Sequence, residues 1–236
     1  MNWLDEIELV FLPGLDGTGL SYKPLREVMP GNVRVTVVNY PTDKKLSYVE
    51  LVQCAYEQLP RNKPLILIAE SFSGPIAISL VSLFPANIKG IIFCATFMKF
   101  SRPFLIGSTR YIPLVFLFRR PVPDFLLYFL VGGKPFSEKL IPLFRQFEKL
   151  VDPEVIVHRI RMFNDIDVTE DARKLHLPCC YIQGIQDKLV SSKSLVPFKK
   201  YLPDIIVKRV NGPHGILQAQ PEECAEIIME FVKSLL

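Results

Sequence analysis

The chain has 236 residues, of which 49% are hydrophobic, and its formal net charge at pH 7 is +4. This length and apolar content predict one large domain with a sizeable core. The charge is too small to indicate a nucleic-acid partner, and the sequence contains no run of Lys and Arg interleaved with aromatic residues.

The sequence favours a cytoplasmic protein. Its five cysteines are an odd number and form no Cys-x-x-Cys pair, which indicates reduced thiols. The first six residues are acidic and lead directly into an apolar run, so no signal peptide is expected. The most hydrophobic long stretch, residues 112–131, contains Arg119, Arg120 and two prolines, and therefore we expect no membrane span.

Apolar runs alternate with amphipathic stretches along most of the chain. The pattern predicts strands over residues 7–12, 33–39, 65–69, 88–95, 179–183 and 205–210. It predicts helices over residues 22–29, 47–59, 75–83, 192–201 and 221–235. Strands that alternate with helices are typical of the α/β class, here with a mostly parallel sheet of about six strands flanked by helices.

This alternation is interrupted by residues 97–164, which are rich in Phe and Pro and helical in pattern. We interpret them as a helical cap, or lid, inserted into a core made of residues 1–96 and 165–236. The segment contains 11 of the 17 phenylalanines. It also carries 11 Lys and Arg against five Asp and Glu, a net charge of +6, whereas the remaining residues have a net charge of −2.

Ser71 is the candidate nucleophile, because it stands between the apolar run 65–69 and a predicted helix. A sharp strand-to-helix turn would lift its hydroxyl clear of the sheet, beside the free N–H groups and positive dipole of the helix N-terminus. The usual nucleophile elbow reads Gly-x-Ser-x-Gly, and here the small residues Ala69 and Ser73 replace the glycines. The alternative is a plain turn in which Ser71 or Ser73 caps the helix.

A serine nucleophile needs a base, and the chain offers only three histidines. His158 falls within the insertion and His176 precedes a predicted strand. His214 lies in a tight loop directly after the strand 205–210, where parallel sheets carry their functional sites. His214 is therefore the candidate base.

The group that orients the base should be a carboxylate after another strand. Asp187 follows the strand 179–183, whereas the residues after the strand 88–95 include no carboxylate. Asp165 and Asp167 lie near the exit of the insertion, and Asp204 precedes a strand. Position therefore favours Asp187, with a simple turn aspartate as the alternative.

The chain order Ser71, Asp187, His214 is that of α/β-hydrolase triads. The sequence resembles the α/β-hydrolase superfamily over nearly its whole length. The resemblance includes Gly184-x-x-Asp187-x-x-Val190, and His214 followed by Pro221-Glu222 and a closing helix. It implies an α/β-hydrolase fold with a cap, and a serine carboxylic ester hydrolase that works through an acyl-enzyme.

The resemblance also implies that the main-chain N–H groups of Leu15 and Phe72 form an oxyanion hole, with Asp16 as the alternative to Leu15. The glycine-rich loop 13–19 is similar to loops of some thioesterases and acyltransferase-like members. Neither a metal nor an organic cofactor is implied.

The insertion suggests what the substrate is. Most of its phenylalanines are explained as the core of the insertion itself, and the surplus predicts an apolar pocket for an acyl chain. Its positive charge, which includes Arg119 and Arg120, predicts an acidic partner: an acyl carrier protein, coenzyme A or an anionic lipid surface. The alternative is a solubilising surface.

In size, capped layout and basic cap, the chain resembles the cytosolic esterases that demethylate pimeloyl-acyl-carrier-protein methyl ester in biotin synthesis. The expected substrate is therefore a small acyl ester, with a carrier-linked methyl ester as the specific candidate. Three alternatives remain: a thioesterase, an acyltransferase, and an inactive hydrolase fold that serves as a binding module.

Overall fold

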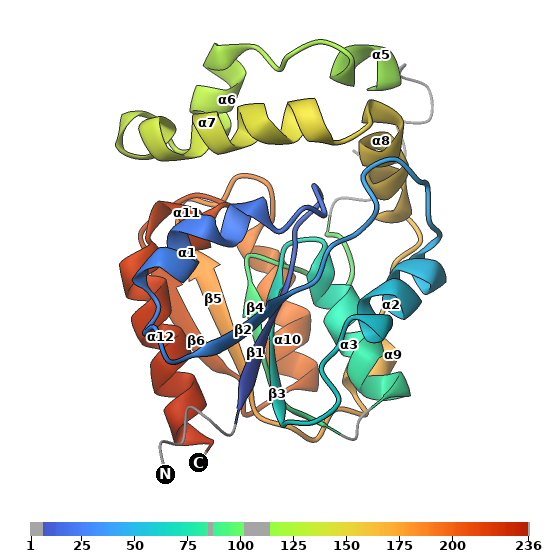
Figure 1. The fold of residues 1–236 in the computed structure, drawn as a ribbon, viewed down its shortest axis with the longest axis vertical. Coiled ribbons are helices and arrows are strands. Elements are labelled where there is room, and N and C mark those ends of the chain that lie inside the picture. Colours follow the sequence, from blue (N-terminus) through green and yellow to red (C-terminus); the bar gives the residue numbers. More distant parts are fainter. Residues whose placement is uncertain (1–6, 85–86, 102–113, 236) are drawn as a thin grey trace.

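The computed structural model describes residues 7–84, 87–101 and 114–235 (Figure 1). Residues 1–6, 85–86 and 102–113 and Leu236 lie outside these ranges. The expected absence of a signal peptide, and Phe104 of the predicted cap, therefore fall outside the described residues.

Within the described residues, six strands form one sheet in the order β2-β1-β3-β4-β5-β6, and every neighbouring pair is parallel. The strands are β1 (Glu8–Leu12), β2 (Arg34–Val37), β3 (Leu65–Glu70), β4 (Ile88–Cys94), β5 (Cys179–Gly184) and β6 (Ile206–Val210). The predicted α/β class and six-stranded parallel sheet are confirmed.

The helices cover both faces and one edge of this sheet. The α-helices are α1 (Lys23–Val28), α2 (Tyr48–Glu57), α3 (Ser73–Leu83), α5 (Leu114–Phe118), α6 (Asp124–Leu130), α7 (Lys134–Leu150), α8 (Pro153–Met162), α9 (Thr169–Ala172), α10 (Leu195–Tyr201), α11 (Ile216–Ala219) and α12 (Pro221–Ser234). Two short 3₁₀ helices, η2 (Leu20–Tyr22) and η4 (Ser192–Ser194), precede α1 and α10.

Alternation along the central strands produces two apolar cores. In β3, Leu65 and Leu67 face the core beneath α2, α3 and α10, whereas Ile66 and Ile68 face the core beneath α1 and α12. Both sets are buried because a parallel sheet is covered on both faces. This double burial explains why the strand appears in the sequence as an unbroken apolar run.

The strand order places a topological switch point between β1 and β3. From β1 the chain moves to β2 on one side, and then returns to β3 on the other side of β1. The loops that leave β1 and β3 therefore separate at the carboxyl edge of the sheet, which is where parallel α/β sheets commonly bind ligands. The loop 13–19 and Ser71 lie on the two sides of this point.

The helices α5 to α8, called here the inserted helices, lie in the chain between β4 and β5 and extend beyond the carboxyl edge of the sheet (Figure 1). Helix α7 crosses above α11, while α5 and α6 form the outermost layer, at the end of the molecule opposite both termini. No helix in the described ranges combines the length and apolarity needed to cross a bilayer.

Candidate active site

Ser71 occupies a strained bend between β3 and α3. Its φ is 48°, in the left-handed region that non-glycine residues rarely adopt. Two bonds hold the bend: Ser71 N–H donates to the Cys94 carbonyl at 2.9 Å, and the Thr96 hydroxyl donates to the Ser71 carbonyl. A Cβ on Gly74 would lie 2.0 Å from Thr96 Oγ1. Glycine at position 74 therefore lets the first turn of α3 lie against the loop after β4.

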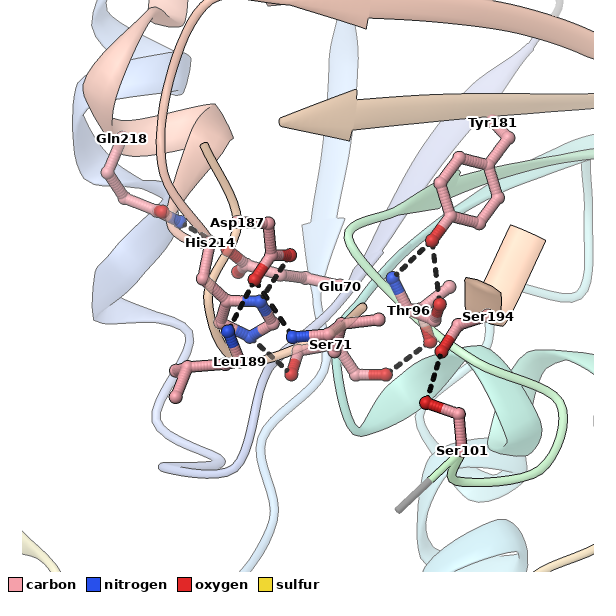
Figure 2. A network of polar contacts seen from close by, with 11 residues as sticks. Glu70, Ser71, Thr96, Ser101, Tyr181, Asp187, Leu189, Ser194, His214 and Gln218 are labelled. Carbon is pink, nitrogen blue, oxygen red and sulfur yellow. Dashed lines mark hydrogen bonds and ion pairs between the residues drawn. The ribbon is translucent and has the colours of Figure 1, made fainter. Parts of the chain in front are cut away.

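The three side chains singled out in the sequence meet at this bend (Figure 2). His214 Nε2 lies 2.8 Å from Ser71 Oγ, and His214 Nδ1 lies 2.9 Å from Asp187 Oδ2. The three residues come from the loops after β3, β5 and β6. This arrangement can pass the Ser71 proton to an imidazole that is oriented by a carboxylate.

Asp187 is itself fixed by its loop. Its Oδ1 accepts hydrogen bonds from the N–H groups of Leu189 and Val190, both at 2.8 Å. The Asp187 side chain is only 5% exposed, while that of His214 is 18% exposed. The carboxylate is therefore sheltered, and one of its oxygens remains for the imidazole.

Opposing effects act on the pKa of His214. Burial lowers the pKa, whereas the charge of Asp187 and its hydrogen bond raise it, with a smaller contribution from Glu70. The net result is a pKa above the ordinary histidine value. A histidine stabilised in this way accepts a proton readily, which suits a general base.

The N–H groups predicted for the oxyanion hole have no protein acceptor among the described residues. Neither Leu15 nor Phe72 donates its N–H to another group there, and the same holds for Asp16. Phe72 is fully buried and directly follows Ser71. Leu15 follows Gly14, and a Cβ at Gly14 would lie 3.9 Å from Ser71 Cβ, so the loop 13–19 passes close to the nucleophile. These N–H groups remain available for an external oxygen.

Arg159, a residue that sequence reasoning missed, ties the inserted helices to the loop 13–19. It belongs to α8 and is only 1% exposed. Its guanidinium donates to the carbonyls of Leu15 at 2.8 Å, Asp16 at 3.0 Å and Pro41 at 2.8 Å. It therefore fixes the peptide units beside the candidate oxyanion hole. The one feature of the sequence that pointed to a role for Arg159 is its charge at a position on the apolar face of α8.

Glu70, also missed, lies directly before Ser71 and is 6% exposed. Gln218 Nε2 donates to one carboxyl oxygen at 2.8 Å (Figure 2). Ser21 Oγ lies 3.4 Å from the other. Burial, and to a lesser degree the charge of Asp16, raise the pKa of Glu70 to about 7. The feature of the sequence that pointed to Glu70 is its position as a carboxylate at the end of the apolar strand β3.

Arg119 and Arg120 do not join this group. They lie in the turn after α5, in the outer layer of the inserted helices. Arg119 is 3.9 Å from a Glu154 oxygen, and Arg120 lies over the Phe116 ring at 5.2 Å. Among the described residues, no three His, Cys, Asp or Glu side chains are grouped as metal ligands.

Solved structures share this fold over nearly the whole chain. A lipase-esterase related protein from Clostridium acetobutylicum has a TM-score of 0.77 at 15% identity, over 98% of this chain and 96% of that chain. A bromoperoxidase from Bacillus anthracis has a TM-score of 0.78 at 18% identity, over 96% and 91%. An α/β hydrolase enzyme from a Medee basin deep-sea metagenome has a TM-score of 0.74 at 14% identity, over 97% and 90%.

These similarities show that the chain has the α/β-hydrolase fold. No protein-family profile matches the sequence. A shorter sequence match is to phytyl ester synthase 1, chloroplastic, of Arabidopsis thaliana, at 30% identity over 84 residues. That match covers 33% of this chain and only 12% of the relative's length.

The role of Arg159 can be tested by stability measurements. Replacing Arg159 with Met leaves three carbonyls without their donor, and we expect the free energy of unfolding to fall by roughly 2–4 kcal/mol in denaturant titrations. Arg161→Met is the matched control, because Arg161 lies on the same helix and is exposed. It should change stability by less than about 0.5 kcal/mol. Equal losses in the two variants would contradict the assigned role.

Glu70 should make stability depend on pH. Its folded-state pKa of about 7 lies above the ordinary 4.5, so the folded protein keeps this proton to higher pH than the unfolded chain does. The free energy of unfolding should therefore fall as pH rises from about 4.5 to about 7. Gln cannot ionise, so Glu70→Gln should flatten this dependence and be more stable at pH 8, by on the order of 2 kcal/mol.

The matched control for this comparison is Glu226→Gln, which changes an exposed carboxylate of α12. It should retain the pH dependence of the parent protein. Denaturant titrations at several pH values measure the difference, and parallel curves for all three proteins would argue against a buried, neutral Glu70.

Proposed function

We propose that this chain is a serine hydrolase that cleaves carboxylic esters of acyl chains. The observation that supports this is the continuous contact from Ser71 Oγ through His214 to Asp187, at 2.8 Å and 2.9 Å. The α/β-hydrolase fold alone would not support it, since one fold hosts many reactions. The specific side-chain geometry carries the argument.

In the proposed reaction, His214 Nε2 removes the Ser71 proton while Ser71 Oγ attacks the ester carbonyl carbon. The oxyanion of the tetrahedral intermediate accepts hydrogen bonds from the N–H groups of Leu15 and Phe72. Collapse of the intermediate breaks the bond to the alcohol oxygen, which takes the proton from His214. Water, activated by the same histidine, then releases the acid, and Asp187 stabilises the charged imidazole throughout.

Aromatic rings beside the nucleophile support an acyl substrate. The Phe163 ring lies 5.9 Å from that of Phe72, 5.2 Å from that of Phe97 and 5.1 Å from that of Phe100. Phe97, Phe100 and Phe163 belong to the two ends of residues 97–164, which we propose to act as a cap over Ser71. Phe72 and Phe97 are buried in this cluster, whereas Phe100 and Phe163 are partly exposed, and we propose that these two contact the hydrocarbon chain of the substrate.

A narrower substrate, a methyl ester carried on an acyl carrier protein, is proposed from sequence resemblance alone. The residues that would serve it are Arg119 and Arg120, through contact with an acidic carrier. The Arg119 side chain is 65% exposed and is therefore accessible to such a partner.

The test of ester hydrolysis is the Ser71→Ala variant, assayed with p-nitrophenyl esters of increasing acyl length. We expect turnover to fall by roughly 10⁴-fold and labelling by a fluorophosphonate probe to be lost, because the nucleophile is gone.

In the parent protein, kcat/KM should rise with pH, because His214 acts as a base only after it loses its proton. The midpoint of this rise should lie above the ordinary histidine pKa, since the pKa of His214 is raised.

Ser192→Ala, at an exposed serine of η4, is the control and should hydrolyse esters at the parent rate. Circular dichroism checks that both variants fold. If the parent protein neither hydrolyses the esters nor reacts with the probe, an inactive hydrolase fold that binds a ligand becomes the better interpretation.

A second candidate is acyl transfer, in which an alcohol replaces water. The observation that favours it is the sequence match to a protein named as an ester synthase, together with the loop 13–19, whose resemblance is to thioesterases and acyltransferase-like members. The acyl-enzyme and triad would be the same, and the acceptor would decide the product.

Adding a long-chain alcohol to the ester assay separates the two reactions. For a hydrolase, we expect free acid as the main product at every alcohol concentration. For a transferase, the acyl-enzyme is intercepted, so new ester should increase with alcohol while total turnover of the first ester is maintained or rises. Mass spectrometry of the products measures this ratio, and the Ser71→Ala variant controls for uncatalysed exchange.

A further inference from the structure

The outer layer of the inserted helices exposes an unusual amount of apolar surface. Six large apolar side chains on α5 and α6 are between 40% and 77% exposed. They are Phe116, Leu117, Phe125, Leu126, Tyr128 and Phe129, called here the outer apolar surface. The other nine exposed large apolar residues of the described chain are distributed over the rest of the structure. Six of the 15 exposed large apolar residues of the described chain thus fall within residues 114–130, and such a concentration is typical of an interaction site, whereas isolated exposed residues are not.

The two helices are held in place with these side chains outward. In α5 only Leu114 is buried, and in α6 only Leu127. Between the helices, Arg145 of α7 donates to the Val122 carbonyl at 2.7 Å, and Glu148 accepts from Val122 N–H at 2.6 Å. The connecting turn is thus fastened to α7 by polar contacts, while the six side chains remain exposed.

Positive charge borders the outer apolar surface. Lys188 Nζ lies 3.6 Å over the ring of Phe129, and the Arg120 guanidinium lies over the ring of Phe116. Asp124 is the one acidic residue between positions 114 and 130, and it is paired with Arg145. Cations beside exposed aromatic rings suit the boundary between lipid headgroups and acyl chains, where anionic phosphates meet hydrocarbon.

We infer that the outer apolar surface docks this protein on an anionic lipid bilayer. A membrane suits it better than an acidic protein does, because large apolar side chains outnumber the cations beside them and would insert below the headgroups. Helices α5 and α6, which carry these side chains, lie at the end of the molecule opposite both termini, so a flat bilayer can reach them (Figure 1). The inference builds on the proposed function, since it makes a membrane the source of the acyl ester.

Vesicle sedimentation tests this directly. The full chain is mixed with vesicles of phosphatidylcholine, either alone or with phosphatidylglycerol. We expect binding to the anionic vesicles, weakened by salt. Phe125→Ser combined with Phe129→Ser should reduce binding by roughly tenfold or more, since two rings no longer leave water. Arg119→Glu combined with Arg120→Glu should reduce binding to anionic vesicles by at least about tenfold.

The matched control is Leu83→Ser combined with Val196→Ser, which removes two apolar side chains of similar exposure from α3 and α10. It should bind vesicles like the parent protein. The Phe125→Ser and Phe129→Ser variant should retain the thermal stability of the parent and its rate on a water-soluble short-chain ester. If the variant retains both properties, its weaker vesicle binding reflects loss of docking and not loss of the fold or of catalysis.

Three results would overturn the inference. They are failure of the parent protein to bind anionic vesicles, equal binding by the parent and both double variants, or binding of an acyl carrier protein in place of vesicles through Arg119 and Arg120. Failure of the docking and failure of the proposed function can be distinguished: vesicle binding without ester hydrolysis would refute the function alone, and hydrolysis without vesicle binding would refute the docking alone.

Discussion

The contact between Asp187 and His214 depends on how the parallel pairing of β5 and β6 continues past the ends of both strands. Gly184 pairs with Val210 at the last rung, and Ile185 N–H then donates to the Val210 carbonyl at 2.9 Å. Gln186 N–H donates to the Gly212 carbonyl, also at 2.9 Å. The two loops are thus joined through their backbones, and a one-residue slip in register would move both side chains to the wrong place.

Several polar groups near this edge of the sheet are buried but satisfied. No buried side-chain nitrogen or oxygen in the described ranges lacks a hydrogen-bond partner. Glu70 and Arg159 are the largest departures from an apolar interior, and both lie beside the groups that would handle a substrate. Burying a polar or charged group is costly unless it is hydrogen-bonded. Three carbonyls accept from Arg159, whereas Glu70 has an amide and a hydroxyl as partners and a raised pKa that favours its neutral form.

The inserted helices face two environments. On the inner side, Arg159 of α8 reaches the carbonyls of Leu15 and Asp16, so these helices contact the loop beside Ser71. On the outer side, α5 and α6 leave aromatic and aliphatic side chains in solvent. One segment of the chain therefore contacts the candidate active site on one side and carries the proposed docking surface on the other.

The sequence alone determined the six strands and the positions of Ser71, Asp187 and His214, because apolar runs and the residues that end them are local patterns. It did not predict the four-residue helices α9 and α11, which are too short to show a period. Only the tertiary structure decided that Arg159 reaches Leu15 across 144 positions, and that Glu70 is buried beneath His214 with its pKa near 7. Such contacts arise from the packing of distant segments, which leaves no local pattern in the residues themselves.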